Sequence, residues 1–558
     1  MDFEELLKHV GDNGKFQVLT IIFFMLSSIL TSPHDYIENF TAAMPAHHCH
    51  VHLLGNPKFE ANVTINLTAE ALLRVSIPVG PNQKPEQCHR FRQTQWQLLD
   101  PNVSAVNYTD PETEPCLDGW IYDQSVFTST IVMEWDLVCD YKSFKYFAQA
   151  ITLSGHLVGS ALSGLISDRF GRKPLLVSCC LAYGILSTCC AFAPVFTIYC
   201  ILRFIHLSQM VLDIFFCFLF PLVFEGNSSK WQLVATMLFS LSGSIGQASF
   251  AGVAYLFRDW HMLQLVIALP YLILSLFSWY VNFESVRWLM ATGKTEQALK
   301  ELQRIARING KKEVAESLTS EILISKMKEE LNTKRESFRM KEIMCKPAVF
   351  KTVLFTSVLA FSTTFSFYGL LLDIENLGKN IFLTQFLLGI TDLPSKFLSY
   401  FILKYVNRRP SSGFSLIILG ISILIPIFVP KEMYVLRLTL YLLGRSSVSV
   451  LSSVLLIFSN ELSATVLRST IQGILFFIAR TAATLSALVL SMRLYFVHLP
   501  AILFGTFPIV ASAFAYFLPE SFNLPLIETI KDMEKRYELR NKSTRKKQRK
   551  VLLATTEC

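Results

Sequence analysis

Two basic residues stand inside long apolar stretches in the second half of the chain. Lys396 lies in the run 380–403, and Arg480 lies midway along the run 469–492. A charge within a membrane span is costly, so such a residue usually marks a substrate or ion site. Two fixed cations facing one cavity would attract an anion, and the guanidinium of Arg480 offers a planar fork to a carboxylate or sulfate. An alternative stays open, because Asp392 could pair with Arg480, or with Lys396 four residues further along the same helical face.

Aromatic side chains in the run 348–370 could supply the apolar part of such a site. Phe361, Phe365 and Tyr368 share one helical face by their spacing of four and three residues, and Phe367 lies beside them. Aromatic rings give flat apolar contacts to ring-bearing or lipid-like anions. The alternative is a stripe that serves helix packing or lipid contact.

Four more polar residues within apolar runs have less certain roles. His34, at the end of the first run, is either a pH-sensitive group near the cavity or an interfacial cap. Arg203 suits packing or gating in the first half, and Asp213 lies deeper in the same run. Arg445 either adds positive potential to the cavity or extends to a membrane interface.

The composition indicates where these side chains must be held. Apolar residues make up 52% of the 558-residue chain and charged residues only 17%, against roughly 25% charged in soluble domains. A bilayer core needs about 20 largely apolar residues per helical span. Runs of this kind occur near 15–33, 143–166, 174–193, 197–222, 233–256, 261–281, 348–370, 380–403, 411–429, 434–459, 469–492 and 499–518. The sequence therefore predicts an all-α membrane protein with twelve transmembrane helices.

The charges between the runs predict the orientation. Lys and Arg are abundant in the segment 283–346 and in the tail, but sparse in the polar segment 41–142. Because cytoplasmic loops carry the excess of basic residues, we expect both termini and segment 283–346 on the cytoplasmic side of the plasma membrane. Segment 41–142 is then extracellular.

Two features of the extracellular segment and its leading edge agree with this orientation. Five Asn-x-Ser/Thr sequons, which are glycosylated only on the lumenal face, occur at Asn39, Asn62, Asn66, Asn102 and Asn107. Four cysteines suit an oxidising compartment and predict two disulfides in one of three pairings: Cys49, Cys88, Cys116 and Cys139.

The runs divide into six and six. We expect a cytoplasmic N-terminus at 1–14, a first six-helix bundle over 15–282, a helical linker over 283–346, a second bundle over 347–518 and a basic tail over 519–558. Two related bundles of this kind are typical of transporters that bind substrate at the midplane between them.

The loop between the second and third runs carries a glycine- and charge-rich motif. Its residues suit a latch at the cytoplasmic helix ends, since Asp168 can pair with basic residues there: Gly164, Asp168, Arg169, Gly171, Arg172 and Lys173. A degenerate copy follows at 404–410 with Arg408 and Arg409, but without the Gly and the Asp, so we expect a weaker second latch. The motif resembles the signature loop of the major facilitator superfamily.

Further segments resemble one branch of that superfamily. They read MDFEELLKHVG at 1–11, CLDGW at 116–120, EWDLVC at 134–139 and ELSATVLR at 461–468. These segments are similar to those of the organic ion transporters, in particular the organic anion transporter subfamily with its rodent-type prostaglandin and steroid-conjugate carriers. The resemblance implies that Lys396 and Arg480 bind the substrate or a counter-anion.

The resemblance also implies a mode of action. We expect secondary-active exchange of an amphipathic organic anion for a counter-anion such as a dicarboxylate. An organic cation or zwitterion carrier of the same fold, or a non-transporting receptor-like member, are the alternatives. Because the spans around 238–246 and 448–456 are poor in the aromatics that renal drug carriers have there, we expect a more aliphatic pocket with a narrower range.

Other classes of function find no support in the sequence. It has no phosphate-binding loop, no metal-ligand spacing and no catalytic pattern. We therefore expect no enzymatic activity, cofactor, metal or nucleic-acid partner, and the lipid bilayer as the surrounding medium.

Overall fold

The structure is a computed structural model of the whole chain. It describes residues 10–11, 14–51, 69–80, 84–99, 112–211, 229–281, 284–321, 323–324, 346–374, 380–430, 432–464, 467–524, 527 and 530–540. These residues form two compact units. Unit 1 comprises Met1–Asn39, Tyr146–Leu256 and Gln264–Cys558, and unit 2 comprises Phe40–Lys145 and Phe257–Leu263.

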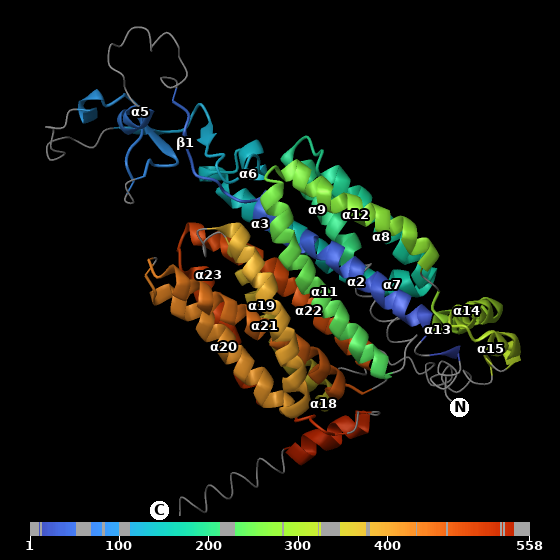
Figure 1. Cartoon of the computed structure of the whole chain (residues 1–558). Helices are drawn as coiled ribbons and strands as arrows, with labels where there is room; N and C mark the ends of the chain where they lie inside the picture. The colour runs from blue at the N-terminus through green and yellow to red at the C-terminus, as the bar shows by residue number, and fades with distance from the viewer. Residues whose placement is uncertain are drawn as a thin grey trace, which may run out of the picture. The chain divides into compact units, whose positions relative to one another are not determined.

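Each of the twelve predicted spans contains a described helix, although the span 197–222 is described only to residue 211, and the all-α membrane fold is confirmed (Figure 1). These helices are α2 (Lys15–Tyr36), α7 (Lys142–Phe170), α8 (Arg172–Cys190), α9 (Phe196–Val211), α11 (Ser229–Leu256), α12 (Trp260–Val281), α18 (Pro347–Leu372), α19 (Ile381–Tyr405), α20 (Arg408–Phe428), α21 (Tyr434–Leu462), α22 (Arg468–Ser491) and α23 (Leu499–Ala515). Eight helices of the described part are long and apolar enough to cross a membrane by length and composition. We call the side of the membrane region on which α2 ends and α7 begins the outer side, and the end of each helix on that side its outer end. The opposite end of each helix is its inner end.

The first six helices pack closely because small residues line their contacts. A Cβ on Gly155 or Gly159 of α7 would lie 2.3 Å from a backbone oxygen of α9, at Phe204 and Ser208 respectively. Small residues four apart let membrane helices approach in this way. Phe24, Leu176, Tyr183 and Tyr271 are among the buried side chains of this bundle.

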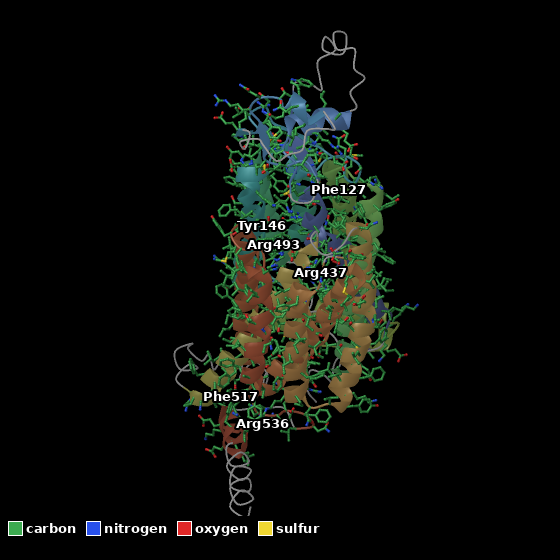
Figure 2. The ribbon with its side chains drawn as sticks, turned by 90° about the vertical axis from the view of Figure 1, so that its left-hand side faces the viewer. Phe127, Tyr146, Arg437, Arg493, Phe517 and Arg536 are labelled. Carbon is green, nitrogen blue, oxygen red and sulfur yellow. A yellow bond between two sulfur atoms is a disulfide. The ribbon has the colours of Figure 1, made fainter. Side chains whose placement is uncertain are left out.

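The last six helices form a second core. Its buried residues include Leu416, Leu451, Phe458 and Ile471. At the outer end, Arg493 in η6 (Met492–Leu494) makes a two-pronged ion pair with Asp373, with one Nη2–Oδ2 distance of 2.6 Å. In Figure 2, Arg437 and Arg493 lie well apart from Phe517 and Arg536 along the length of this bundle.

A helix over residues 530–540 closes the inner end of the second bundle. Tyr537 shares a 3.0 Å hydrogen bond with Thr352 of α18, and Met533 and Tyr537 belong to the bundle's core. Arg540 donates to the carbonyl oxygens of Tyr516 and Phe517, which lie just beyond the end of α23. This tail helix therefore supplies partners to carbonyls that end a membrane helix.

The described part of the linker contains three short helices after α12. They are α13 (Val286–Ala291), α14 (Thr295–Ile308) and α15 (Lys312–Ser317), and Figure 1 places α14 and α15 near the inner end of α2. Asn309 holds the N-terminal segment against this linker, because its Oδ1 accepts from Phe16 N at 3.0 Å and its Nδ2 donates to Gly11 O at 2.9 Å. A shared core of Phe16, Trp288 and Leu302 completes the attachment.

Unit 2 is a small disulfide-linked module. Its elements are α3 (Glu38–Thr41, which begins in unit 1), β1 (His47–Cys49), α5 (Ala69–Ser76), β2 (His89–Phe91), η2 (Trp96–Leu99), β3 (Thr113–Pro115), β4 (Trp120–Tyr122), α6 (Ile131–Glu134) and η3 (Cys139–Tyr141). β1 pairs antiparallel with β4, and β2 with β3. Of the three pairings left open by the sequence, the structure has Cys49–Cys116 and Cys88–Cys139.

Of the five predicted glycosylation sites, the structure describes one. Asn62, Asn66, Asn102 and Asn107 lie outside the described residues. Asn39 lies in α3 with 5% of its surface exposed. A glycan has no room on so buried a side chain, which argues against the expectation of glycosylation at Asn39.

The two bundles meet closely in the outer half of α11 and α19. A Cβ on Gly389 would lie 2.5 Å from Ala248 N and 2.6 Å from Ala248 Cα. Nearer the outer end, the rings of Tyr255 and Phe382 contact edge to face, with centroids 5.6 Å apart. The outer half of this interface is therefore closed.

Replacing Gly389 by Ala should destabilise this closed arrangement. The added methyl must push α11 and α19 apart, and overpacking of this kind costs roughly 1–3 kcal/mol. We expect a lower unfolding temperature for detergent-purified Gly389→Ala protein. Gly473→Ala is the matched control, because nothing lies within 4 Å of the methyl it would add on α22. Equal unfolding temperatures in the two variants would contradict the close approach.

Candidate functional site

A cavity of about 450 Å³ lies between the two bundles. Its described lining residues come from α2, α7 and α11 of the first bundle, and from α18, α19, α21 and α22 of the second. The acidic, basic and histidine residues in its lining are Asp35, His156, Asp392, Lys396, Arg445 and Arg480. The structure thus brings the two basic residues singled out in the sequence into one cavity and adds a third.

Arg480 reaches across the bundle interface. Its Nη1 lies 3.1 Å from the hydroxyl of Tyr368 and 3.3 Å from Nδ1 of His156. Tyr368 belongs to the same bundle as Arg480, whereas His156 comes from α7. With Nδ1 as the acceptor, both groups are neutral, so they stabilise the guanidinium without cancelling its charge.

Asp392 does not hold Lys396, contrary to one alternative from the sequence. Its Oδ2 accepts from Ser244 at 2.9 Å, and its Oδ1 accepts from Ser449. Within the described part of the chain, no carboxylate lies within 4 Å of the Lys396 ammonium. The two serines come from α11 and α21, so they draw the aspartate away from the lysine on its own helix.

Arg445 proves to be a cavity residue rather than an interfacial one. It is 7% exposed, and its Nη2 donates to Tyr36 Oη at 3.1 Å and to Gln247 Oε1 at 3.3 Å. Its guanidinium also lies 4.3 Å from the ring centroid of Phe367. A cation over an aromatic face gains about 2 kcal/mol or more when desolvated, so the ring helps to hold this charge.

The aromatic stripe of α18 divides between two faces. Phe367 and Tyr368 line the cavity, as do Thr363 and Thr364 one turn earlier. Phe361 and Phe365 do not: Phe365 packs against Phe504 and Phe507 of α23, with centroids 4.8 Å and 5.4 Å away.

The prediction of a cavity role was therefore wrong for Phe361 and Phe365. Phe361 stacks on Phe365 at 5.6 Å and contacts Phe507 at 6.0 Å, inside the second bundle. The spacing of four placed Phe361 and Phe365 on one face correctly, but Tyr368 lines the cavity instead of sharing that face. Periodicity also does not say which neighbour a face meets.

His34 also lies away from the cavity. It is 1% exposed and packs against the rings of Tyr183, His206 and Tyr271, with centroids 4.9, 5.3 and 6.3 Å away. Both alternatives from the sequence, a group near the cavity and an interfacial cap, are thus replaced by a core position in the first bundle. The neighbouring turn of α2 supplies the cavity residues Asp35 and Tyr36 instead.

Arg203 is a packing residue of the first bundle, as one sequence alternative had it. It is fully buried, and its Nη2 lies 3.1 Å from Glu38 Oε1. Asp213 lies outside the described residues.

The pocket wall is richer in hydroxyls than the sequence suggested. From α11 the cavity receives Phe239, Ser240, Gly243, Ser244 and Gln247, and from α21 it receives Arg445, Val448, Ser449 and Ser452. The expectation of an aliphatic pocket was therefore wrong. The leucines and isoleucines of these spans face elsewhere, and serines at a spacing of three or four residues were the signal to follow.

The first latch loop wraps around an acidic residue from the linker. Gly171 has a φ of +90°, and a Cβ there would lie 2.8 Å from Glu284 Oε2 and 2.9 Å from the Trp288 ring. The same carboxylate accepts from Lys173 N at 3.2 Å. Arg169 lies over the Phe170 ring, 5.7 Å from its centroid. The side chains of Asp168 and Arg172, and the surroundings of Gly164, lie outside the described part.

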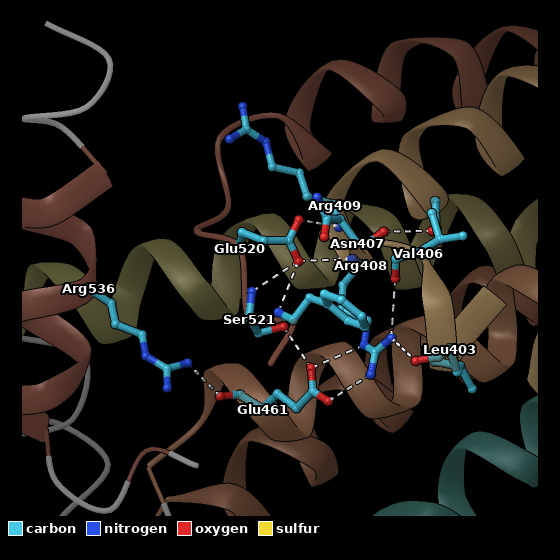
Figure 3. A network of polar contacts seen from close by, with 11 residues as sticks. Leu403, Val406, Asn407, Arg408, Arg409, Glu461, Glu520, Ser521 and Arg536 are labelled. Atoms are coloured by element: carbon cyan, nitrogen blue, oxygen red, sulfur yellow. Dashed lines mark hydrogen bonds and ion pairs between the residues drawn. The ribbon is translucent and has the colours of Figure 1, made fainter. Parts of the chain in front are cut away.

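The second latch is well partnered, although its sequence is degenerate (Figure 3). Glu520 accepts from Arg408 N at 2.9 Å and from Arg409 N at 3.2 Å, as Glu284 does in the first loop. The Arg408 side chain lies 3.3 Å from both Glu461 oxygens, and Ser521 donates to Glu461 at 2.7 Å. The expectation of a weaker latch overlooked these distant carboxylates.

The family model of the Major Facilitator Superfamily matches residues 140–488. The chain is similar to solute carrier family 22 member 22 from Mus musculus, with 55% identity over 100% of both chains. It is also similar to two Homo sapiens proteins at 96% coverage of both chains: solute carrier family 22 member 12, at 42% identity, and the steroid transmembrane transporter SLC22A24, at 41%.

The chain belongs to solute carrier family 22 of the major facilitator superfamily. Among solved structures, it resembles the xylose transporter XylE from E. coli in a partially occluded inward-open conformation. That likeness has a TM-score of 0.59 and 15% identity, and covers 90% of this chain and 100% of the other. The fold is thus that of a membrane transporter, and the chain is a solute carrier rather than an enzyme.

Replacing Glu520 by Gln tests the second latch. The change removes a charged acceptor of the α20 N-terminus, and a hydrogen bond to a charged group contributes roughly 1.5–3 kcal/mol. We expect a lower unfolding temperature for the purified carrier. Glu538→Gln is the control, since Glu538 is exposed on the tail helix. A latch variant as stable as this control would mean that the capping contacts contribute nothing.

Proposed function

We propose that this carrier transports amphipathic organic anions, such as prostaglandins and steroid sulfates, by anion exchange. The proposal depends chiefly on one observation: among the described residues that line the central cavity, three side chains are cationic and two are carboxylates. The cations are Lys396, Arg445 and Arg480, and the acids are Asp35 and Asp392. One excess positive charge in a site of low dielectric favours a monoanion and disfavours a cation.

The donors suit the headgroups of such anions. Arg480 and Arg445 present planar guanidinium groups, which bind carboxylate or sulfate oxygens in pairs. Lys396 adds a compact charge with three donors. A bound anion would exchange its water for these groups, which is favourable only because the donors already face the cavity.

The rest of the wall suits an apolar body that carries a few polar groups. Tyr36, Phe239, Phe367, Tyr368 and Phe476 supply aromatic surface. Serine and threonine hydroxyls between them can bind the hydroxyl or keto groups of a lipid-derived anion. This mixed lining supports steroid and prostaglandin conjugates, and the similarity to a protein named as a steroid transporter points the same way.

Rocking of the two bundles about this site would expose it to each side of the membrane in turn. In the described state, the contact of Gly389 with Ala248 closes the outer half. Reorienting the empty carrier would move an uncompensated positive charge, whereas a bound anion neutralises it. A loaded carrier therefore changes between its outward-facing and inward-facing states more readily than an empty one. A counter-anion such as a dicarboxylate loads the carrier for the return step. We place the linker, both termini and the inner end on the cytoplasmic side of the plasma membrane, in line with their basic residues.

Uptake by cells that express the protein tests the anion selectivity. We expect estrone sulfate and prostaglandin E2 to enter, and tetraethylammonium to be excluded. Arg480→Asp reverses the excess charge of the cavity and should reduce anion uptake by at least about tenfold, as expected from the loss of a charged hydrogen bond. Arg480→Lys keeps the charge and should retain part of the uptake.

Surface labelling controls for the amount of carrier. Anion uptake that persisted in Arg480→Asp at equal surface expression would overturn the assigned site. Uptake of the cation alone would indicate a cation carrier, and no uptake of any compound would favour a receptor-like protein.

A second experiment tests the exchange mechanism. Cells or vesicles are preloaded with glutarate, and the initial rate of labelled estrone sulfate uptake is measured. Because a loaded return step avoids moving the bare charge, we expect preloading to raise the rate several-fold. Preloading with an uncharged sugar is the control. Equal rates under both conditions would indicate uniport instead.

A further inference from the structure

A second cavity opens beside the central one, between α11, α19 and α21. It has a volume of about 220 Å³. Its wall consists of Met237, Ser240, Leu241, Lys396, Phe397, Ser399, Tyr400, Leu403, Ser452, Ser453, Leu456 and Ile457. Ser240, Lys396 and Ser452 line both cavities. We call the second cavity the side pocket, and it lies toward the inner ends of its three helices.

The side pocket is more apolar than the number of serines in its wall suggests. Three of its serines bond to carbonyl oxygens of their own helices: Ser399 to Lys396 at 2.7 Å, Ser452 to Val448 at 2.8 Å and Ser453 to Ser449 at 3.2 Å. A serine bonded back to its helix offers little to a ligand beyond its carbon atoms. Leucine, isoleucine, methionine and aromatic side chains make up most of the remaining wall.

Among the described residues that line this pocket, Lys396 alone is charged, and it lines both cavities. As described above, Asp392 is bonded to Ser244 and Ser449. The ammonium is thus placed to bind an anionic group at the mouth of an apolar recess. A single fixed charge beside apolar surface is complementary to an amphiphile with one anionic end.

We propose that the side pocket holds the alkyl chain of a transported anion whose carboxylate binds Lys396. This inference rests on the proposed function and narrows its substrate class to anions with a flexible aliphatic chain. An apolar cavity of roughly 150 Å³ holds a benzene molecule, so the side pocket has room for a short alkyl segment. Phe397, one of the lining residues, is 52% exposed, so the wall of the pocket reaches the surface of the protein.

The charge and the chain then have separate binding places. Rigid ring systems of similar size fit the aromatic central cavity but cannot bend past Lys396. Straight-chain carboxylates can, and each methylene that enters the side pocket should raise affinity about fourfold. Affinity should therefore depend on chain length in a way that side-pocket substitutions alter.

Inhibition of labelled estrone sulfate uptake by straight-chain carboxylates from butanoate to dodecanoate tests this in cells expressing the whole chain. The first readout is the ratio of the butanoate and octanoate inhibition constants within each variant, so differences in expression cancel. The second readout is the chain length that has the lowest inhibition constant. We expect octanoate to bind at least about tenfold more tightly in the wild type, a modest fraction of the methylene effect. Ser453→Phe fills the pocket and should bring the ratio close to one. Leu403→Ala enlarges the pocket and should shift the best chain length upward.

Ser249→Phe is the matched control, because it adds the same ring to an exposed serine of α11 that lines neither cavity. A wild-type ratio in Ser453→Phe, or equal losses in Ser453→Phe and Ser249→Phe, would overturn the side pocket. If Ser453→Phe does not reach the surface, the chain-length optimum of Leu403→Ala decides alone. A wild type without anion uptake would instead overturn the proposed function itself.

Discussion

Charges within the membrane region must be given partners, and in this protein both bundles supply them. Arg445 from the second bundle bonds to Tyr36 and Gln247 of the first, and Arg480 contacts His156 across the same interface. Asp392 accepts from one serine of each bundle. Because a buried charge without partners is costly, these contacts determine how the bundles can meet. The polar centre of the interface is therefore also its binding site.

In both halves of the protein, the backbone N–H groups at the start of one helix need acceptors. In each half, the loop that starts a helix directs backbone N–H groups at a carboxylate from the end of that half: Glu284 for Lys173, and Glu520 for Arg408 and Arg409. A carboxylate at a helix N-terminus satisfies orphan donors and favours the helix dipole. Both halves thus have stiffened inner loops, which suits bundles that move as bodies about a central site.

The sequence predicts some of these features well and others poorly. Hydropathy located the twelve helices because the bilayer imposes one strong requirement of length and polarity. Lys396 and Arg480 could be found because charge is rare in such runs. Phe361 and Phe365 were misplaced since their periodicity names a face but not its neighbour. The partners of Arg408 lie 53 and 112 residues away, so no local pattern could have indicated that the second latch was complete.

The nature of the partners bears on transport. Tyr36, Gln247, Tyr368 and His156 are neutral when the imidazole accepts from Arg480, so they hold the two guanidinium groups in place while the excess charge of the cavity remains. Carboxylates in their place would stabilise the empty site more strongly, but an arriving anion would then have to displace them. Neutral partners leave most of the Coulombic gain to the substrate, and they leave the empty carrier charged and slow to reorient. On the proposed function, affinity for anions and a preference for exchange therefore have the same physical origin.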